Sequence, residues 1–274
     1  MALNNERRTF GVNPAISRVN NFDDAFASQN VSSYAGVYAK IAYFLALVLL
    51  GVGAFFYMHS YFGSQGYSFT QIAEGYVVYS NEVTIMTGAW IITLIVGLVA
   101  AFVPSTIPVT GSIYCAGMGY CITLTSFIYA AQYSGIVVEA LVLTVLIIAV
   151  MAFLYYSGIV HVGERFKTVV YTALIVSVIG SLIFFLLYKL APNSAIVSSI
   201  TTIQNGPVGI LLAALGVVLG ACLLLIDFET IAEAVQNGVN KKYEWYCGYS
   251  LMLSVIYIYL RVLILLSRIQ NSKR

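Results

Sequence analysis

Three ionisable side chains stand inside long apolar stretches of the sequence: Glu139, Asp227 and Arg261. A charged side chain in the hydrocarbon core of a bilayer costs a few kcal/mol or more, so such residues usually pair with one another or line a path for ions or protons. We therefore take these three residues as the candidate site, and permeation or gating as the chemistry that suits them.

Each of the three also has a purely structural interpretation. Asp227 lies about ten residues, or roughly 15 Å, from the end of its predicted helix, where neighbouring backbone or hydroxyl donors can satisfy a carboxylate. The long side chain of Arg261 can snorkel to the interface. Glu139 lies about one turn inside its helix, at a depth similar to that of Arg261. It is either a wetted carboxylate at a helix end or the partner of Arg261 in an ion pair.

Metal binding and cofactors receive little support from the sequence. Asp227 is the residue we expect to contact a cation such as calcium, which prefers oxygen ligands. His59 and His161 are predicted in loops on opposite faces, so each is expected to be a surface residue without a role. The cysteines lack the spacing of a zinc site and are expected to be reduced. No cofactor is expected.

The composition determines the broad class of the protein. Of its 274 residues, 60% are hydrophobic and 9% are charged, against roughly 25% charged in soluble domains. Such a chain cannot cover its surface with polar groups, so its solvent must be the lipid bilayer. The net charge of +2 is small and not clustered, which excludes nucleic acid as a partner.

Apolar runs close to the roughly 20 residues that a membrane-spanning helix needs recur along the chain. We predict an all-α, polytopic membrane protein with a polar cytoplasmic segment over 1–37, a transmembrane domain over 38–268 and a short tail over 269–274. The seven predicted helices are 38–58, 83–103, 109–131, 135–157, 168–190, 207–236 and 244–268.

The lysines and arginines predict the orientation, because cytoplasmic loops carry more of them. An amino terminus in the cytoplasm places eight there: Arg7, Arg8, Arg18, Lys40, Arg165, Lys167, Lys241 and Lys242. It leaves four outside: Lys189, Arg268, Lys273 and Arg274. We therefore predict a cytoplasmic amino terminus and an external carboxyl terminus.

The last third of the chain, residues 205–269, resembles the transmembrane Bax inhibitor motif family, particularly its bacterial branch. The residues on which this rests are Asp227 after an apolar run, Glu244-Trp245-Tyr246, Tyr259-Leu260 before Leu263 to Arg268, and the early Asn13-Pro14-Ala15. The resemblance implies six helices around a central seventh. It also implies an integral protein of the bacterial cytoplasmic membrane.

The resemblance further implies a pH-sensitive calcium leak, in which an aspartate of the sixth helix pairs with a carboxylate of the seventh. Asp227 matches the aspartate, but Arg261 stands where the family has Asp or Glu. An arginine favours the charged form of a neighbouring aspartate and repels divalent cations, so the pH sensor is altered here. The family's latch arginine is absent from residues 83–103, and Arg261 is our hypothesis for its replacement.

We therefore expect a cation leak channel, with calcium as the permeant ion and an altered pH sensor. One alternative is a proton-linked transporter of a small solute, although no inverted repeat is visible. Another is an interaction protein that binds other membrane proteins, such as quality-control proteases. An enzyme is not expected, since no nucleophile elbow is present.

Overall fold

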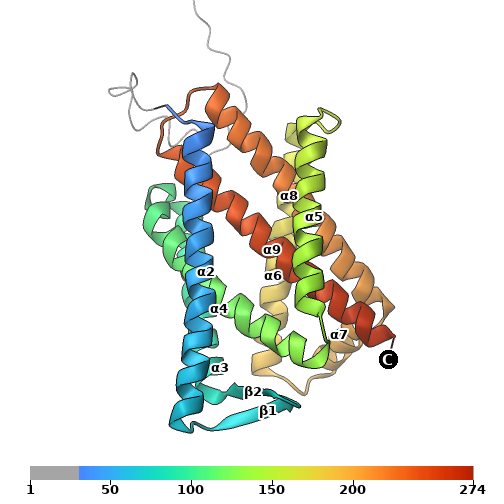
Figure 1. The fold of residues 1–274 in the computed structure, drawn as a ribbon. Helices are drawn as coiled ribbons and strands as arrows, with labels where there is room; N and C mark the ends of the chain where they lie inside the picture. Colours follow the sequence, from blue (N-terminus) through green and yellow to red (C-terminus); the bar gives the residue numbers. More distant parts are fainter. Residues whose placement is uncertain (1–30, 274) are drawn as a thin grey trace, which may run out of the picture.

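The computed structural model describes residues 31–273, and most of them are helical (Figure 1). Seven helices are long and apolar enough to cross a membrane, which confirms the predicted all-α polytopic fold. They are α2 (Tyr34–Gln65), α3 (Ser80–Phe102), α4 (Ile107–Gln132), α5 (Ile136–Tyr156), α6 (Glu164–Leu190), α8 (Pro207–Gln236) and α9 (Tyr243–Ser272). A short 3-10 turn, η1 (Pro104–Thr106), precedes α4.

Helix α9 is the central helix of the bundle, and it crosses Figure 1 diagonally behind α2. It packs against α8 most extensively, and also against α2, α4 and α5. A hydrogen bond from Arg261 to Ser177 joins it to α6, and Met252 packs in one cluster with Ala100 of α3. The predicted arrangement of six helices around a seventh is therefore confirmed.

The two ends of the bundle differ. We call one the hairpin end, because strands β1 (Phe69–Ala73) and β2 (Tyr76–Tyr79) form an antiparallel hairpin there. The carboxyl terminus lies at the same end (Figure 1), and so does the short helix α7 (Ala195–Asn205), which leads into the start of α8. We call the other the loop end, after the α8–α9 connection. The hairpin and α7 were not predicted, because neither is long enough to span a bilayer.

At the loop end, the residues that precede α2 form hydrogen bonds with the α8–α9 connection and with the start of α9. Ser32 donates its backbone N–H to Val239 (2.8 Å) and its hydroxyl to the carbonyl of Asn240 (3.0 Å). Ser33 caps α2 and donates its N–H to Glu244 at 3.1 Å. The start of α2 is thereby tied to the start of α9, and the side chain of Glu244 is fully buried.

Several helices extend beyond the predicted spans, among them α2 and α9. Helix α2 continues to Gln65, where Gly66 adopts a left-handed conformation (φ 69°), and α9 continues to Ser272. The predictions counted only the apolar residues that fill a bilayer, whereas these helices project past it. As a correction, His59 lies within α2 and not in a loop. Arg261 lies eleven residues before the last residue of α9, not about seven.

Helices α2 and α4 approach each other closely through glycines. A β-carbon at Gly119 would overlap the carbonyl oxygen of Val48, and one at Gly51 would overlap that of Ala116. Small residues at helix crossings let two backbones come together, which strengthens packing in membranes.

We predict that Gly119→Ala destabilises the protein by about 1–3 kcal/mol, because the added methyl group must push α2 away from α4. Thermal unfolding in detergent measures this. Gly88→Ala is the control, since a β-carbon there meets no atom of the described chain within 4 Å, and it should leave the unfolding temperature unchanged or slightly raised. Equal effects of the two substitutions would contradict a tight crossing at Gly119.

Candidate functional site

The candidate site lies along the contact between α8 and α9, which we call the α8–α9 seam. The two helices run antiparallel, and three contacts set their register. Asp227 accepts a hydrogen bond of 2.5 Å from the Ser250 hydroxyl. Farther toward the hairpin end, the Arg261 side chain lies against Gly216, and Arg268 donates to the carbonyl of Gly209. Candidate residues of opposite charge therefore share one seam at different depths.

Asp227 is 5% exposed and follows a run of buried apolar residues on α8. Ser250 binds its Oδ1 atom, and Ser254 faces the same carboxylate one turn along α9. Its Oδ2 atom has no hydrogen-bond partner among the described residues. A buried carboxylate oxygen without a donor is costly, and it is available to a proton or a cation.

Asp227 and Arg261 are not partners. Arg261 follows Ser250 by eleven residues, or roughly 16 Å of helix. Its guanidinium donates to the Ser177 hydroxyl of α6 (3.1 Å) and lies 4.9 Å from the centre of the Tyr257 ring. On α9, Asp227 lies level with Ser250 and Ser254 instead.

The ion pair considered between Glu139 and Arg261 does not form in the described structure. Glu139 is exposed in the first turn of α5 and accepts a hydrogen bond of 3.3 Å from Gln270, near the end of α9. Arg261 instead faces α8 and α6. Similar depth was the basis of that expectation, but depth does not determine which face of a helix a side chain occupies.

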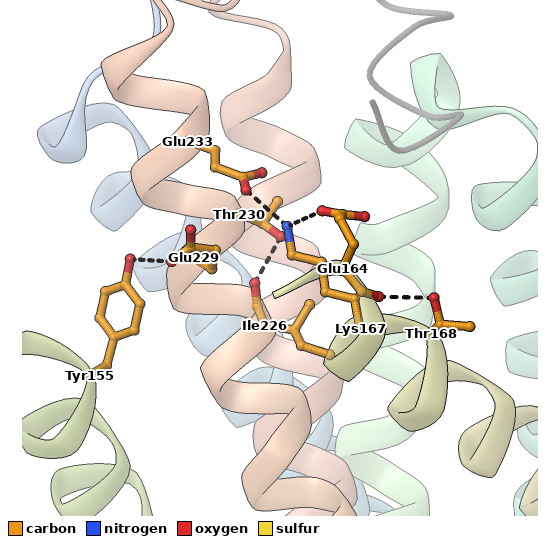
Figure 2. A network of polar contacts seen from close by, with 8 residues as sticks. All are labelled: Tyr155, Glu164, Lys167, Thr168, Ile226, Glu229, Thr230 and Glu233. Carbon is orange, nitrogen blue, oxygen red and sulfur yellow. Dashed lines mark hydrogen bonds and ion pairs between the residues drawn. The ribbon is translucent and has the colours of Figure 1, made fainter. Parts of the chain in front are cut away.

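A polar network lies between Asp227 and the loop end (Figure 2). The amino group of Lys167 on α6 lies 2.8 Å from Glu233 of α8 and 3.3 Å from Glu164. One turn before Glu233 on α8, Glu229 accepts a hydrogen bond of 2.9 Å from the Tyr155 hydroxyl of α5. This network therefore joins α5 and α6 to α8.

Only part of this network leaves a signal in the sequence. Asp227, Glu229 and Glu233 occupy the last three turns of α8, which becomes amphipathic there. Lys167 was predicted only as a cytoplasmic charge, because no spacing rule predicts which distant helix a carboxylate will face. The pairing of α6 with α8 determined its partner.

The residues around Asp227 differ in the two directions along the seam. Toward the loop end, Tyr171 of α6 lies near both Asp227 and Glu233, so polar groups continue to the network. Toward the hairpin end a buried apolar cluster includes Leu224, Ile258 and Leu263, and the two arginines of α9 lie beyond Asp227 on the same seam. Asp227 therefore has polar neighbours toward the loop end and a buried apolar cluster next to it toward the hairpin end.

A resident metal is not supported by the site. Within residues 31–273 no three His, Cys, Asp or Glu side chains are grouped so that they could hold a metal ion. Calcium takes six to eight oxygen ligands, and at this depth the seam offers the carboxylate of Asp227 with the hydroxyls of Ser250 and Ser254.

Comparison with protein families gives a match over nearly the whole chain. Residues 13–271 match the family model described as Bax inhibitor 1 like. The chain belongs to the Bax inhibitor 1-like family. No curated protein and no solved structure matches it. The matched range includes the seven spanning helices of this Bax inhibitor 1-like protein, except the last residue of α9, together with Asp227, Arg261 and Glu139.

The Bax inhibitor 1-like chain has a further buried acidic group near the hairpin end, which was not among the residues predicted from the sequence. Glu82 of α3 is fully buried, and one of its oxygens lies 2.7 Å from Nδ1 of His59 on α2. Its other oxygen accepts the backbone N–H of Tyr79 at 2.9 Å. The His59 ring also packs against Phe55 and Phe127. The expectation that His59 is a surface residue without a role was therefore wrong.

We predict that Glu82→Ala destabilises the protein by about 3–5 kcal/mol, because it removes one member of a buried, hydrogen-bonded pair. Thermal unfolding measures the loss. Glu74→Ala removes an exposed carboxylate from the nearby hairpin turn and should shift the unfolding temperature little. A similar small shift for Glu82→Ala would show that the pair contributes nothing to stability.

Proposed function

We propose that this Bax inhibitor 1-like protein is a cation leak channel, with calcium as the permeant ion and Asp227 as the residue that cations contact. The observation on which this rests is the buried Asp227 carboxylate, whose Oδ2 atom has no hydrogen-bond partner in the described part of the chain. It stands where polar groups give way to a buried apolar cluster along the α8–α9 seam. The proposed role is not enzymatic.

We infer that the protein lies in a bacterial cytoplasmic membrane with its loop end in the cytoplasm. Five described cations lie at or near the loop end: Lys40, Arg165, Lys167, Lys241 and Lys242. Three lie near the hairpin end: Lys189, Arg268 and Lys273. This excess agrees with the preference of cytoplasmic loops for Lys and Arg. The predicted cytoplasmic residues Arg7, Arg8 and Arg18, and the predicted external residue Arg274, lie outside the described range.

The described conformation corresponds to a closed channel in this proposal. Ser250 occupies Oδ1 of Asp227, and the apolar residues toward the hairpin end are closely packed. Opening requires α9 to move relative to α8, so that water or a cation replaces the serine hydroxyl. The Ser250 hydrogen bond therefore stabilises the closed state.

The pH sensor is altered in this proposal, because within residues 31–273 no second carboxylate faces Asp227 from α9. The acidic residue of α9, Glu244, lies six positions before Ser250 and binds Ser33 instead. Two carboxylates that share a site compete for one proton, and this competition is missing at Asp227. Any response to pH then depends on the single carboxylate and on the network at the loop end.

We predict that Asp227→Asn slows calcium entry into proteoliposomes by about tenfold, the ratio produced by about 1.4 kcal/mol of lost attraction for the ion. Ser250→Ala should speed entry, because it removes the hydrogen bond that holds the closed seam. A calcium dye inside the vesicles reports the rate between pH 5 and pH 8, and empty vesicles give the baseline.

The matched control for this experiment is Glu74→Gln. It removes an exposed carboxylate from the hairpin turn and leaves the seam untouched, so its rate should equal that of the wild type. If the wild type leaks no faster than empty vesicles, the channel proposal is wrong. The proton-linked transporter and the protein that binds other membrane proteins are then the functions to test.

A further inference from the structure

Two arginines of α9 occupy the half of the α8–α9 seam nearer the hairpin end. Arg261 donates one hydrogen bond to Ser177 at 3.1 Å. Arg268, two turns farther along, donates one to the carbonyl of Gly209. A guanidinium group has five N–H donors, so each of these neutral acceptors satisfies only a fraction of the group it binds.

Neither arginine has an acidic partner in the described part of the chain. The ion pairs within residues 31–273 involve Glu82, Glu164 and Glu233, all on other elements. Glu139 lies near the same end but binds Gln270. The positive charge of Arg261 also acts on Arg268. Two cations of like charge inside a membrane-spanning helix therefore lack an anion among the described residues.

The seam is shaped to accept the two side chains. Arg261 and Arg268 are seven residues apart, and so are Gly209 and Gly216, the α8 glycines that they contact. A β-carbon at Gly216 would lie 2.9 Å from Cδ of Arg261. The glycines therefore leave room for the arginine stems to lie on the α8 backbone, and both arginine side chains remain partly exposed.

The surroundings of the two arginines indicate the nature of the missing anion. Beyond Ser177, most of the large apolar residues of α6 are left uncovered by the rest of the described chain. Val178, Ile179 and Leu182 are 52%, 51% and 44% exposed. This apolar face suits acyl chains, so a ligand with a negative head and apolar chains meets both requirements.

We propose that Arg261 and Arg268 form a binding site for the phosphate of an anionic phospholipid, in the leaflet at the hairpin end. Arg268 lies one turn before the end of α9, at headgroup depth, and Arg261 lies roughly 10 Å deeper. Guanidinium groups bind phosphate oxygens through paired, charge-assisted hydrogen bonds. The acyl chains of the lipid lie along α6. This site does not depend on the proposed channel function.

Native mass spectrometry of the purified protein with phosphatidylglycerol or phosphatidylcholine tests the proposal. The wild type is expected to retain phosphatidylglycerol at least about tenfold more strongly than phosphatidylcholine, the ratio that one charge-assisted interaction provides. Arg261→Gln and Arg268→Gln should each abolish most of this preference, and Arg268→Lys, which keeps the charge, should restore part of it. Circular dichroism checks that each variant is folded.

The matched control is Lys189→Gln, which removes a cation near the same end of α6 but outside the seam. It should retain the lipid preference of the wild type. Equal retention of the two lipids by the wild type, or the same loss in the Lys189 variant as in the arginine variants, would overturn the proposal. A competition experiment with inorganic phosphate tests the source of the phosphate group. If millimolar inorganic phosphate displaces phosphatidylglycerol completely, the site binds free phosphate and the lipid assignment is wrong.

Discussion

The structure depends on how polar groups are satisfied along the contact between α8 and α9. In hydrocarbon, an ionisable side chain is tolerated only where protein, water or a lipid headgroup surrounds it. Here α8 supplies the carboxylate of Asp227 and two glycines that leave its backbone accessible. Helix α9 supplies a serine and two arginines, each at the position along the helix that contacts one of these groups. The other helices enclose the part of this contact around Asp227, whereas the two arginines remain partly exposed.

The neighbouring helices contribute unequally to this shielding. Helices α2 and α4 pack tightly through Gly51 and Gly119, and a cluster around Phe44 and Tyr249 joins them to α9. Helix α6 is far less buried, with few of its side chains enclosed by the rest of the described chain. Polar contacts through Lys167 and Ser177, together with an apolar cluster around Val170, hold it to α8 and α9. The bundle therefore combines a close contact between α2 and α4 with a helix, α6, that contributes few buried side chains.

Much of the fold was predictable from the sequence because lipid imposes a simple rule on composition. Each spanning helix needs a long apolar run, and seven such runs correspond to seven helices, with Asp227 and Arg261 correctly placed within two of them. The Glu82–His59 pair was not predictable in this way. Glu82 lies just before the predicted helix 83–103 and His59 was assigned to a loop, and only the length of α2 and the fold of the hairpin bring them together.

The charge distribution along α9 has an electrical consequence. Arg261 and Arg268 belong to one rigid helix, whereas Asp227 belongs to another, so a displacement of α9 against α8 separates charges of opposite sign along the membrane normal. A unit charge that crosses the whole bilayer exchanges about 2.3 kcal/mol with each 100 mV of membrane potential. If the proposed opening moves α9 along the membrane normal, the charge of Arg261 crosses part of this field, and the balance between the closed and open states then depends on the voltage across the membrane.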